Sequence, residues 1–196
     1  SPLSAPVCPR ESTWRADLAG DELARLFASP RPGNLHRALW SIELAGKDEA
    51  HRAAAILAHP DPWLRARAAA IAGQDPSCAP RIAPLLGDPD PRVRFAAIGG
   101  VTGPAGWEAL VLPLARDSDP YVALRAHREL IHSRDRAVSQ RSVGALLRGR
   151  DPYVTHWNLC PVAGPEAADE ALRWLEEEPQ RDDLSYLEHN LASSFA

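Results

Sequence analysis

The side chains in this chain that are best suited to metal binding or proton transfer are its histidines. Seven are present: His36, His51, His59, His127, His132, His156 and His189. A metal or catalytic site needs several such groups at spacings that bring them together. Only His127 and His132 are close neighbours, and a separation of five residues puts them on different faces of a helix. The histidines alone therefore predict no metal site.

Nucleophilic and phosphate-binding patterns are also missing from the sequence. There is no Ser/His/Asp or Cys/His order with a recognisable local context, and no glycine-rich phosphate loop. Cys8, Cys78 and Cys160 lack the Cys-x-x-Cys spacing of a metal site. We expect a protein that is not an enzyme, with no catalytic residues, no cofactor and no metal.

The cysteines and the first residues bear on the compartment. We expect Cys78 and Cys160 to be buried structural thiols. Methionine is absent even at position 1, and the start, residues 1–6, is rich in proline and small residues. This favours an exported protein slightly over a cytoplasmic one, although a trimmed chain or a linker has the same look. In an exported protein, a disulfide between Cys8 and Cys78 would tie the N-terminal arm to the rest of the chain.

An Asp-Pro pair recurs along the chain and sets its organisation. The pairs begin at Asp61, Asp90, Asp119 and Asp151, at spacings of 29, 29 and 32 residues. Aspartate caps the first backbone N–H groups of a helix, and proline suits the first helical position because its φ is fixed and it has no N–H to leave unpaired. Each pair therefore predicts the start of a helix. A fixed period of this length is typical of a solenoid built from one repeated unit.

Between these anchors there is room for a turn and one more helix. Apolar residues at helical spacing run through 77–86, 105–115, 137–147 and 166–176, with glycine or proline at the ends. No segment alternates apolar and polar residues as a strand would. Extending the register to Asn34 and Asp183 gives about six units. The prediction is an all-α superhelical solenoid, with residues 1–15 as an extended N-terminal arm and 16–196 as one domain with an acidic cap from about residue 165.

The repeated unit resembles a known family. The segment from Asp90 reads Asp-Pro-Arg-Val-Arg-Phe-Ala-Ala, and the segment from Asp61 reads Asp-Pro-Trp-Leu-Arg-Ala-Arg-Ala-Ala. Both are similar to HEAT-like repeats, in the short form of the phycobilisome-lyase type. The resemblance implies that the alanines let each second helix pack closely on its neighbours. It also implies a ladder of Asp and Arg bonds between repeats, which here would use Asp61, Arg65, Asp90 and Arg94. Ala123 and Thr155 replace the arginine in the next two units, so the ladder is expected to weaken there.

Some HEAT-like proteins are enzymes or nucleic-acid-binding modules, and these are the alternatives. Deoxyhypusine hydroxylases hold two irons with His-Glu dipeptides, whereas this chain has none and comes closest at 127–129 and 188–189. Phycobilisome lyases attach bilins to cysteines of other proteins, and nothing beyond the repeat supports that activity here. HEAT-like DNA glycosylases hold a damaged duplex on a basic, aromatic surface with a carboxylate, and this chain has such residues in part. The formal net charge of −4 argues against a general nucleic-acid binder.

Charge is unevenly distributed along the chain. Residues 165–196 hold nine acids against Arg173 and Arg181, a local charge of −7 that leaves +3 for the rest. We expect this acidic end to be the solvated cap that a terminal repeat needs. The alternative is that it competes with a partner for basic residues elsewhere. No apolar run approaches the length of a membrane-spanning helix.

A strip of aromatic and arginine side chains is predicted along the second helices. At about 100° per residue, positions 3, 7, 10 and 11 after each anchor form the core stripe, and positions 2, 6, 9 and 13 lie opposite. The aromatic–arginine strip consists of Trp63, Arg67, Arg92, Tyr121, Arg125, Arg128, Tyr153 and Trp157. Such residues are enriched in protein-binding hot spots, and an acidic peptide or protein surface is the natural complement. Alternatively, the aromatic residues only cover the junctions between repeats. We predict a non-catalytic protein-binding scaffold or accessory subunit of a complex.

Overall fold

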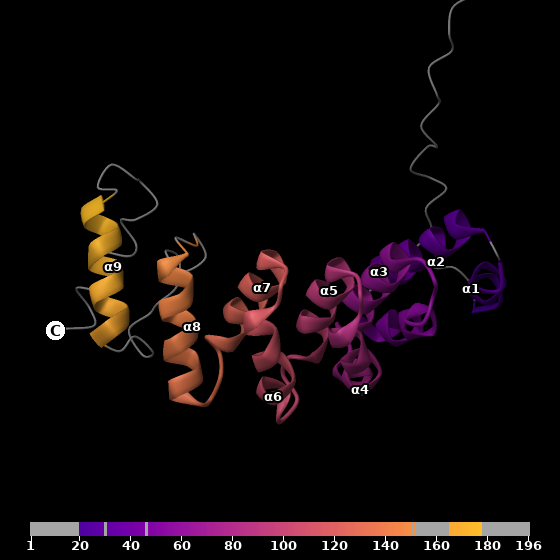
Figure 1. The fold of residues 1–196 in the computed structure, drawn as a ribbon. Helices are drawn as coiled ribbons and strands as arrows, with labels where there is room; N and C mark the ends of the chain where they lie inside the picture. Colours follow the sequence, from indigo (N-terminus) through magenta and orange to yellow (C-terminus); the bar gives the residue numbers. More distant parts are fainter. Residues whose placement is uncertain (1–19, 30, 46, 150, 152–164, 178–196) are drawn as a thin grey trace, which may run out of the picture.

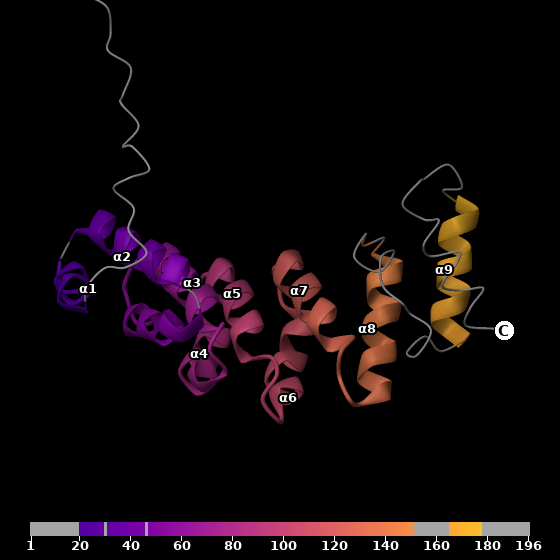
Figure 2. The ribbon, with the colours of Figure 1, turned by 180° about the vertical axis from the view of Figure 1, so that it is seen from behind.

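The helices stack side by side into an elongated row that runs from α1 to α9 (Figure 1). The computed structural model describes residues 20–29, 31–45, 47–149, 151 and 165–177. These residues form α-helices and 3-10 helices and no strand, so the predicted all-α solenoid is confirmed. The view from behind shows the same order of helices (Figure 2). None of the described helices is both long and apolar enough to cross a bilayer.

Three of the predicted helix starts open consecutive helices of one row. These helices are α3 (Pro62–Ala72), α5 (Pro91–Val101) and α7 (Pro120–Leu130). The capping aspartates, Asp61, Asp90 and Asp119, each accept a hydrogen bond of 2.9 Å from the backbone N–H two residues on. Proline occupies the first helical position in all three, as the Asp-Pro pattern predicts. Within the row, α3 packs on α5 and α5 packs on α7.

The helices that precede α5 and α7 form a second row, and they are more interrupted than the sequence pattern indicates. The segment predicted over 77–86 is divided into η3 (Pro76–Cys78), α4 (Ala79–Ile82) and η4 (Ala83–Gly87). The segment predicted over 105–115 is divided into α6 (Trp107–Val111) and η5 (Leu112–Arg116). Pro84 and Pro113 explain the breaks, because a proline inside a helix removes one hydrogen bond and its ring clashes with the carbonyl four residues earlier. In Figure 1, α4 and α6 lie below α5 and α7.

The remaining helices form the two ends of the elongated row. On the N-terminal side lie α1 (Gly20–Phe27), α2 (Pro32–Ala45) and η2 (Lys47–Ile56). On the other side lie α8 (Arg136–Arg148), which has no internal proline, and α9 (Pro165–Glu177). The predictions for 137–147 and 166–176 are therefore confirmed to within one residue at each end. The chain pairs α3 with η2, α5 with η4 and α7 with η5, so each pair forms a helical hairpin.

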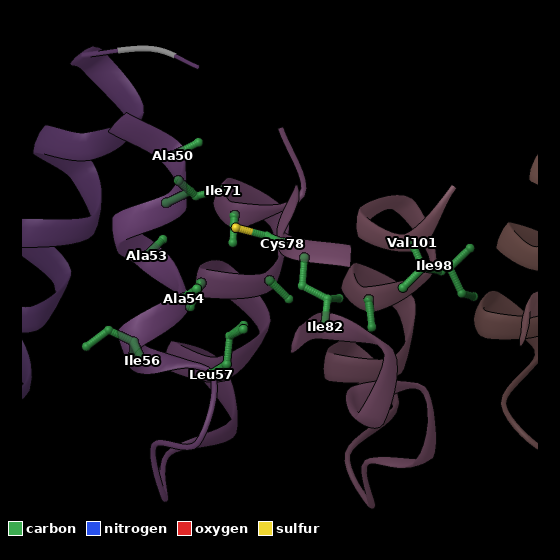
Figure 3. Close-up of a cluster of buried hydrophobic side chains, with 14 of the residues drawn as sticks. Ala50, Ala53, Ala54, Ile56, Leu57, Ile71, Cys78, Ile82, Ile98 and Val101 are labelled. Carbon is green, nitrogen blue, oxygen red and sulfur yellow. The ribbon is translucent and has the colours of Figure 1, made fainter. Parts of the chain in front are cut away.

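The core lies between the two rows and is built largely from small side chains. Alanines of η2 pack beside Ile71 of α3 and Ile82 of α4 (Figure 3). The predicted core stripe of α3 and α5 is buried throughout: Leu64, Ala68, Ile71, Ala72, Val93, Ala97, Gly100 and Val101. Alanine has little bulk beyond the backbone, so helices can approach closely along the row. Cys78 is buried and its thiol is free. Cys8, the other half of the disulfide considered from the sequence, and Cys160 lie outside the described residues.

Candidate functional site

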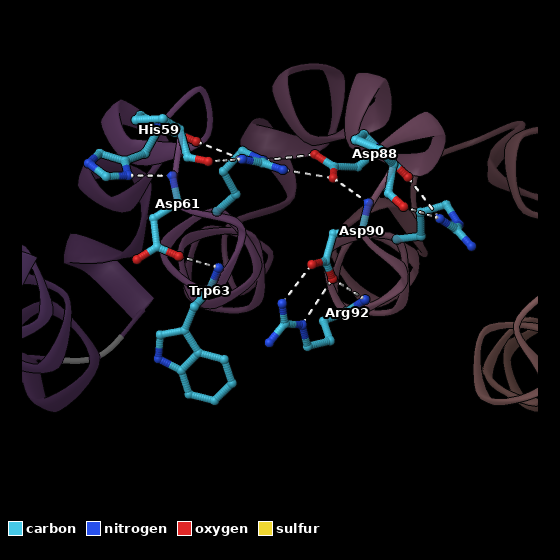
Figure 4. A network of polar contacts seen from close by, with 10 residues as sticks. His59, Asp61, Trp63, Asp88, Asp90 and Arg92 are labelled. Atoms are coloured by element: carbon cyan, nitrogen blue, oxygen red, sulfur yellow. Dashed lines mark hydrogen bonds and ion pairs between the residues drawn. The ribbon is translucent and has the colours of Figure 1, made fainter.

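A ladder of buried ion pairs joins successive repeats, but its acids are not the predicted ones. The guanidinium of Arg65 donates from Nε and Nη2 to the two carboxylate oxygens of Asp88, at 2.8 Å each (Figure 4). Its Nη1 donates to the carbonyls of His59 and Pro60 in the loop before α3. The expected ladder acid Asp90 caps α5 instead. Such an Arg–Asp pair between successive repeats is called a rung below.

Two further rungs lie within the described residues. Arg94 donates to Asp117 at 2.8 and 2.7 Å, and Arg128 donates to Asp151 at 2.9 and 2.7 Å. In all of these rungs the acid lies 23 residues after the arginine. The ladder therefore continues although position 123 is alanine. Arg128, five residues later in α7, supplies the guanidinium instead. Arg128 of the predicted strip thus also has a structural role between repeats. The residues that follow Asp151, where the sequence predicts a helix capped by it, lie outside the described residues.

The rungs fix the ionisation of their acids. Hydrogen bonds from Arg65 hold the pKa of Asp88 below its ordinary value, and those from Arg94 do the same for Asp117. Outside the ladder, the hydrogen bond from Arg92 lowers the pKa of Asp90 to about 2. Asp88 is buried, so its charge would be costly without the partner. Asp88 and Asp117 are therefore ionised at neutral pH.

A hollow of about 430 Å³ opens on the face of α3, α5 and α7. Its lining is mainly apolar, with a polar rim. The lining residues are Trp63, Ala66, Arg67, Ala70, Pro91, Arg92, Phe95, Asp119, Tyr121 and Val122. Four residues of the predicted strip, Trp63, Arg67, Arg92 and Tyr121, are thereby brought together. The repeat explains this, because Trp63, Arg92 and Tyr121 each follow the first proline of their helix and so take equivalent positions along the row.

The aromatic residues at this hollow are open to solvent. Trp63 is 53% exposed and Tyr121 is 72% exposed. Figure 4 shows the Trp63 ring pointing away from the polar network of the loops, on the side where Arg92 also lies. The view that these residues mainly seal the junctions between repeats does not fit such exposure.

The arginines of the face already have acidic partners within the chain. Arg67 is paired with Glu43 of α2, Arg92 with Asp90, and Arg125 with Glu129. Two of them also lie over aromatic rings: Arg67 is 5.3 Å from the centre of Trp40, and Arg125 is 5.6 Å from that of Phe95. The face therefore does not carry the free positive charge that the sequence pattern indicates.

Sequence reasoning missed two residues of this face, Trp40 and Phe95. Both are large hydrophobic side chains that are exposed to solvent. Trp40 lies six residues after Asn34, a strip position, so applying the projection to the α2 unit would have found it. Phe95 lies five residues after Asp90, just outside the projected arc. Tyr153 and Trp157 of the predicted strip lie outside the described residues.

The histidines do not gather in the part of the chain that the structure describes. There, no group of three or more His, Cys, Asp or Glu side chains could hold a metal ion. His127 is half-buried in α7, where burial lowers its pKa, and His132 is exposed.

The comparisons with known proteins agree with this geometry. The family model for HEAT repeats matches residues 49–102, from η2 to the end of α5. This stretch of the chain is similar to HEAT repeats. No curated protein and no solved structure matches it. HEAT repeats generally mediate protein–protein interaction and typically serve as non-catalytic scaffolds. The matched repeats contain the Arg65–Asp88 rung and seven of the ten residues that line the hollow, and α7 also has a capping aspartate and a rung.

Proposed function

We propose that this protein is a non-catalytic binding scaffold or accessory subunit of a protein complex. Its partner is another protein, bound on the face lined by the second helices of the repeats, α3, α5 and α7. The observation that carries the proposal is the apolar hollow of about 430 Å³ flanked by exposed Trp63 and Tyr121. Large aromatic residues beside a concave apolar surface are the features of a binding hot spot.

The position of these aromatic residues within the repeat supports the same function. Both follow a helix-capping Asp-Pro pair, where the backbone is held by the cap and the rings are directed outward. A rigid backbone under an exposed aromatic ring lowers the entropy lost when a partner binds. The arrangement fits a protein surface or peptide better than a solvated helix face.

Charge favours a protein partner over nucleic acid on this face. Phosphate binding needs arginines or lysines that are free to replace counterions. Arg67, Arg92 and Arg125 are each engaged with a carboxylate of the chain. A nucleic acid would have to displace these acids before its phosphates could bind.

Site-specific photo-crosslinking in extracts of the native cell tests the proposal. A benzophenone amino acid is placed at Ala70, which is exposed in the hollow, and in a control chain at Ala109, which is exposed on α6. A defined protein should be captured from Ala70 and not from Ala109, and Trp63→Ala together with Tyr121→Ala should abolish the capture. Equal labelling from both positions, or capture that survives the double substitution, would refute this face as the binding site.

A further inference from the structure

The hollow has the dimensions of a side-chain pocket. At about 430 Å³ it lies near the lower end of the range of about 300–1,000 Å³ found for small-molecule sites. An α-helix is about 10 Å across with its side chains and is too wide to enter it. One large side chain, projecting from a bound segment, fills such a space.

The walls suit an apolar side chain. Ala66 and Ala70 of α3 leave room where longer residues would fill the space, and Phe95 and Val122 supply further apolar surface. Trp63 and Tyr121 stand on either side, from α3 and α7. An aromatic ring of the partner would gain area burial from the alanines and ring contacts from its neighbours.

The charged residues of the hollow determine which partner residue can lie next to that apolar side chain. Arg67 and Arg92 are neutralised by Glu43 and Asp90. Asp119 accepts backbone N–H groups, from Tyr121 at 2.9 Å and Val122 at 3.1 Å, and forms no ion pair with any residue that the structure describes. Asp119 therefore leaves a negative charge in the lining that has no counter-ion, and a cation of the partner would complement it.

We infer that the partner binds through a segment with one large apolar side chain, preferably aromatic, next to a lysine or arginine. This inference rests on the proposed function and replaces the acidic partner expected from the sequence. An acidic segment would gain little here, because it would compete with Glu43 and Asp90 for guanidinium groups that already have short contacts with them.

Selection from a random dodecapeptide display library against the full chain tests the inference. Enriched peptides should share an aromatic or large aliphatic residue adjacent to a basic one. Ala70→Phe, which fills the hollow, should weaken their binding at least tenfold. Ala109→Phe adds the same side chain on α6 and should change nothing. Asp119→Asn keeps a capping side chain and should weaken the binding of basic peptides by about threefold. Trp63→Ala opens the hollow instead of filling it and should also give a large loss, so the test does not depend on one variant folding.

The outcomes separate the two proposals. Enriched acidic peptides without an apolar residue, lost on Arg67→Gln or Arg92→Gln, would overturn the inference and leave the binding face intact. Peptides that bind all of these variants equally, or a library that yields no peptide, would overturn both the inference and the binding face. Basic peptides that bind Asp119→Asn with unchanged affinity would overturn the role of Asp119 in the inference.

Discussion

Gly73 and Gly100 bring the backbones of two neighbouring repeats into direct contact. A Cβ atom on Gly73 would lie 2.5 Å from Cα of Gly100 and 3.1 Å from the carbonyl oxygen of Ala69. Neither neighbour can move as a flexible side chain would, because both atoms belong to the backbone. The C-terminal ends of α3 and α5 are thus held at a distance that only glycine permits.

Gly73→Ala should therefore destabilise the protein. Overpacking of this kind typically costs about 1–3 kcal/mol, since one helix must shift away from the other. The matched control is Gly87→Ala, because a Cβ there meets nothing within 4 Å. The denaturant midpoint of the two variants gives the answer, and a similar midpoint for both would contradict the close approach of α3 and α5.

Removing a rung should cost more than removing a surface ion pair. Arg65→Gln leaves the carboxylate of Asp88 buried without its cation, and breaking a buried pair costs about 3–5 kcal/mol. Arg52→Gln removes the exposed pair with Glu49 and should cost no more than about 1 kcal/mol. Urea unfolding measures both. Adding Asp88→Asn to Arg65→Gln should recover part of the loss, and a simple sum of the two single effects would argue against the rung.

Acid should destabilise the fold through these carboxylates. The pKa values of Asp88, Asp90 and Asp117 are lowered in the folded state, so their contribution to stability is complete above the ordinary value of 3.8 and is lost as the pH falls through the lowered values. The contribution of these carboxylates to the free energy of unfolding should therefore be constant from about pH 7 to 5 and fall below about pH 4. The lowered pKa of His127 adds a separate, earlier decrease as the pH falls below its ordinary value of 6.5. In Arg92→Gln, NMR titration should show the pKa of Asp90 rising from about 2 toward 3.8. An unchanged titration would mean that Arg92 is not its partner in solution.

Trp63 should matter for binding far more than for stability. Its ring is mostly exposed, so Trp63→Ala should change the free energy of unfolding by less than about 1 kcal/mol. Trp107, a core residue of α6, is the matched control, and Trp107→Ala should cost about 3–5 kcal/mol. Thermal unfolding of both variants, with the capture experiment for Trp63→Ala, separates the two roles. A large loss of stability in Trp63→Ala would make it a packing residue.

Local rules in the sequence were enough to predict the caps and the core stripe. Asp61 caps its helix and Leu64 is buried because both depend on their own helix and on its register. The ladder acids were harder to choose. Asp88 and Asp90 lie two residues apart and recur with the same period, so spacing alone does not tell which one faces the previous repeat.

The sequence pattern could not predict that the arginines of the face are paired with carboxylates of the same chain. Arg67 is neutralised by Glu43, which lies 24 residues away on a different helix. That pairing depends on how α2 sits against α3, and a helical projection of one segment carries no such information. The breaks at Pro84 and Pro113, in contrast, were readable from the sequence, because proline disrupts an α-helix wherever it occurs inside one.

In the proposed function, the rungs also limit how far the binding face can adapt to a partner. Arg65 and Arg94 each join two loops, so neighbouring helices cannot rotate freely about the turns that connect them. The curvature of α3, α5 and α7 is consequently set before any encounter, and little induced fit is available to enlarge or narrow the hollow. Because the hollow cannot widen, it excludes a segment whose side chain is too large, and this steric exclusion makes the site selective.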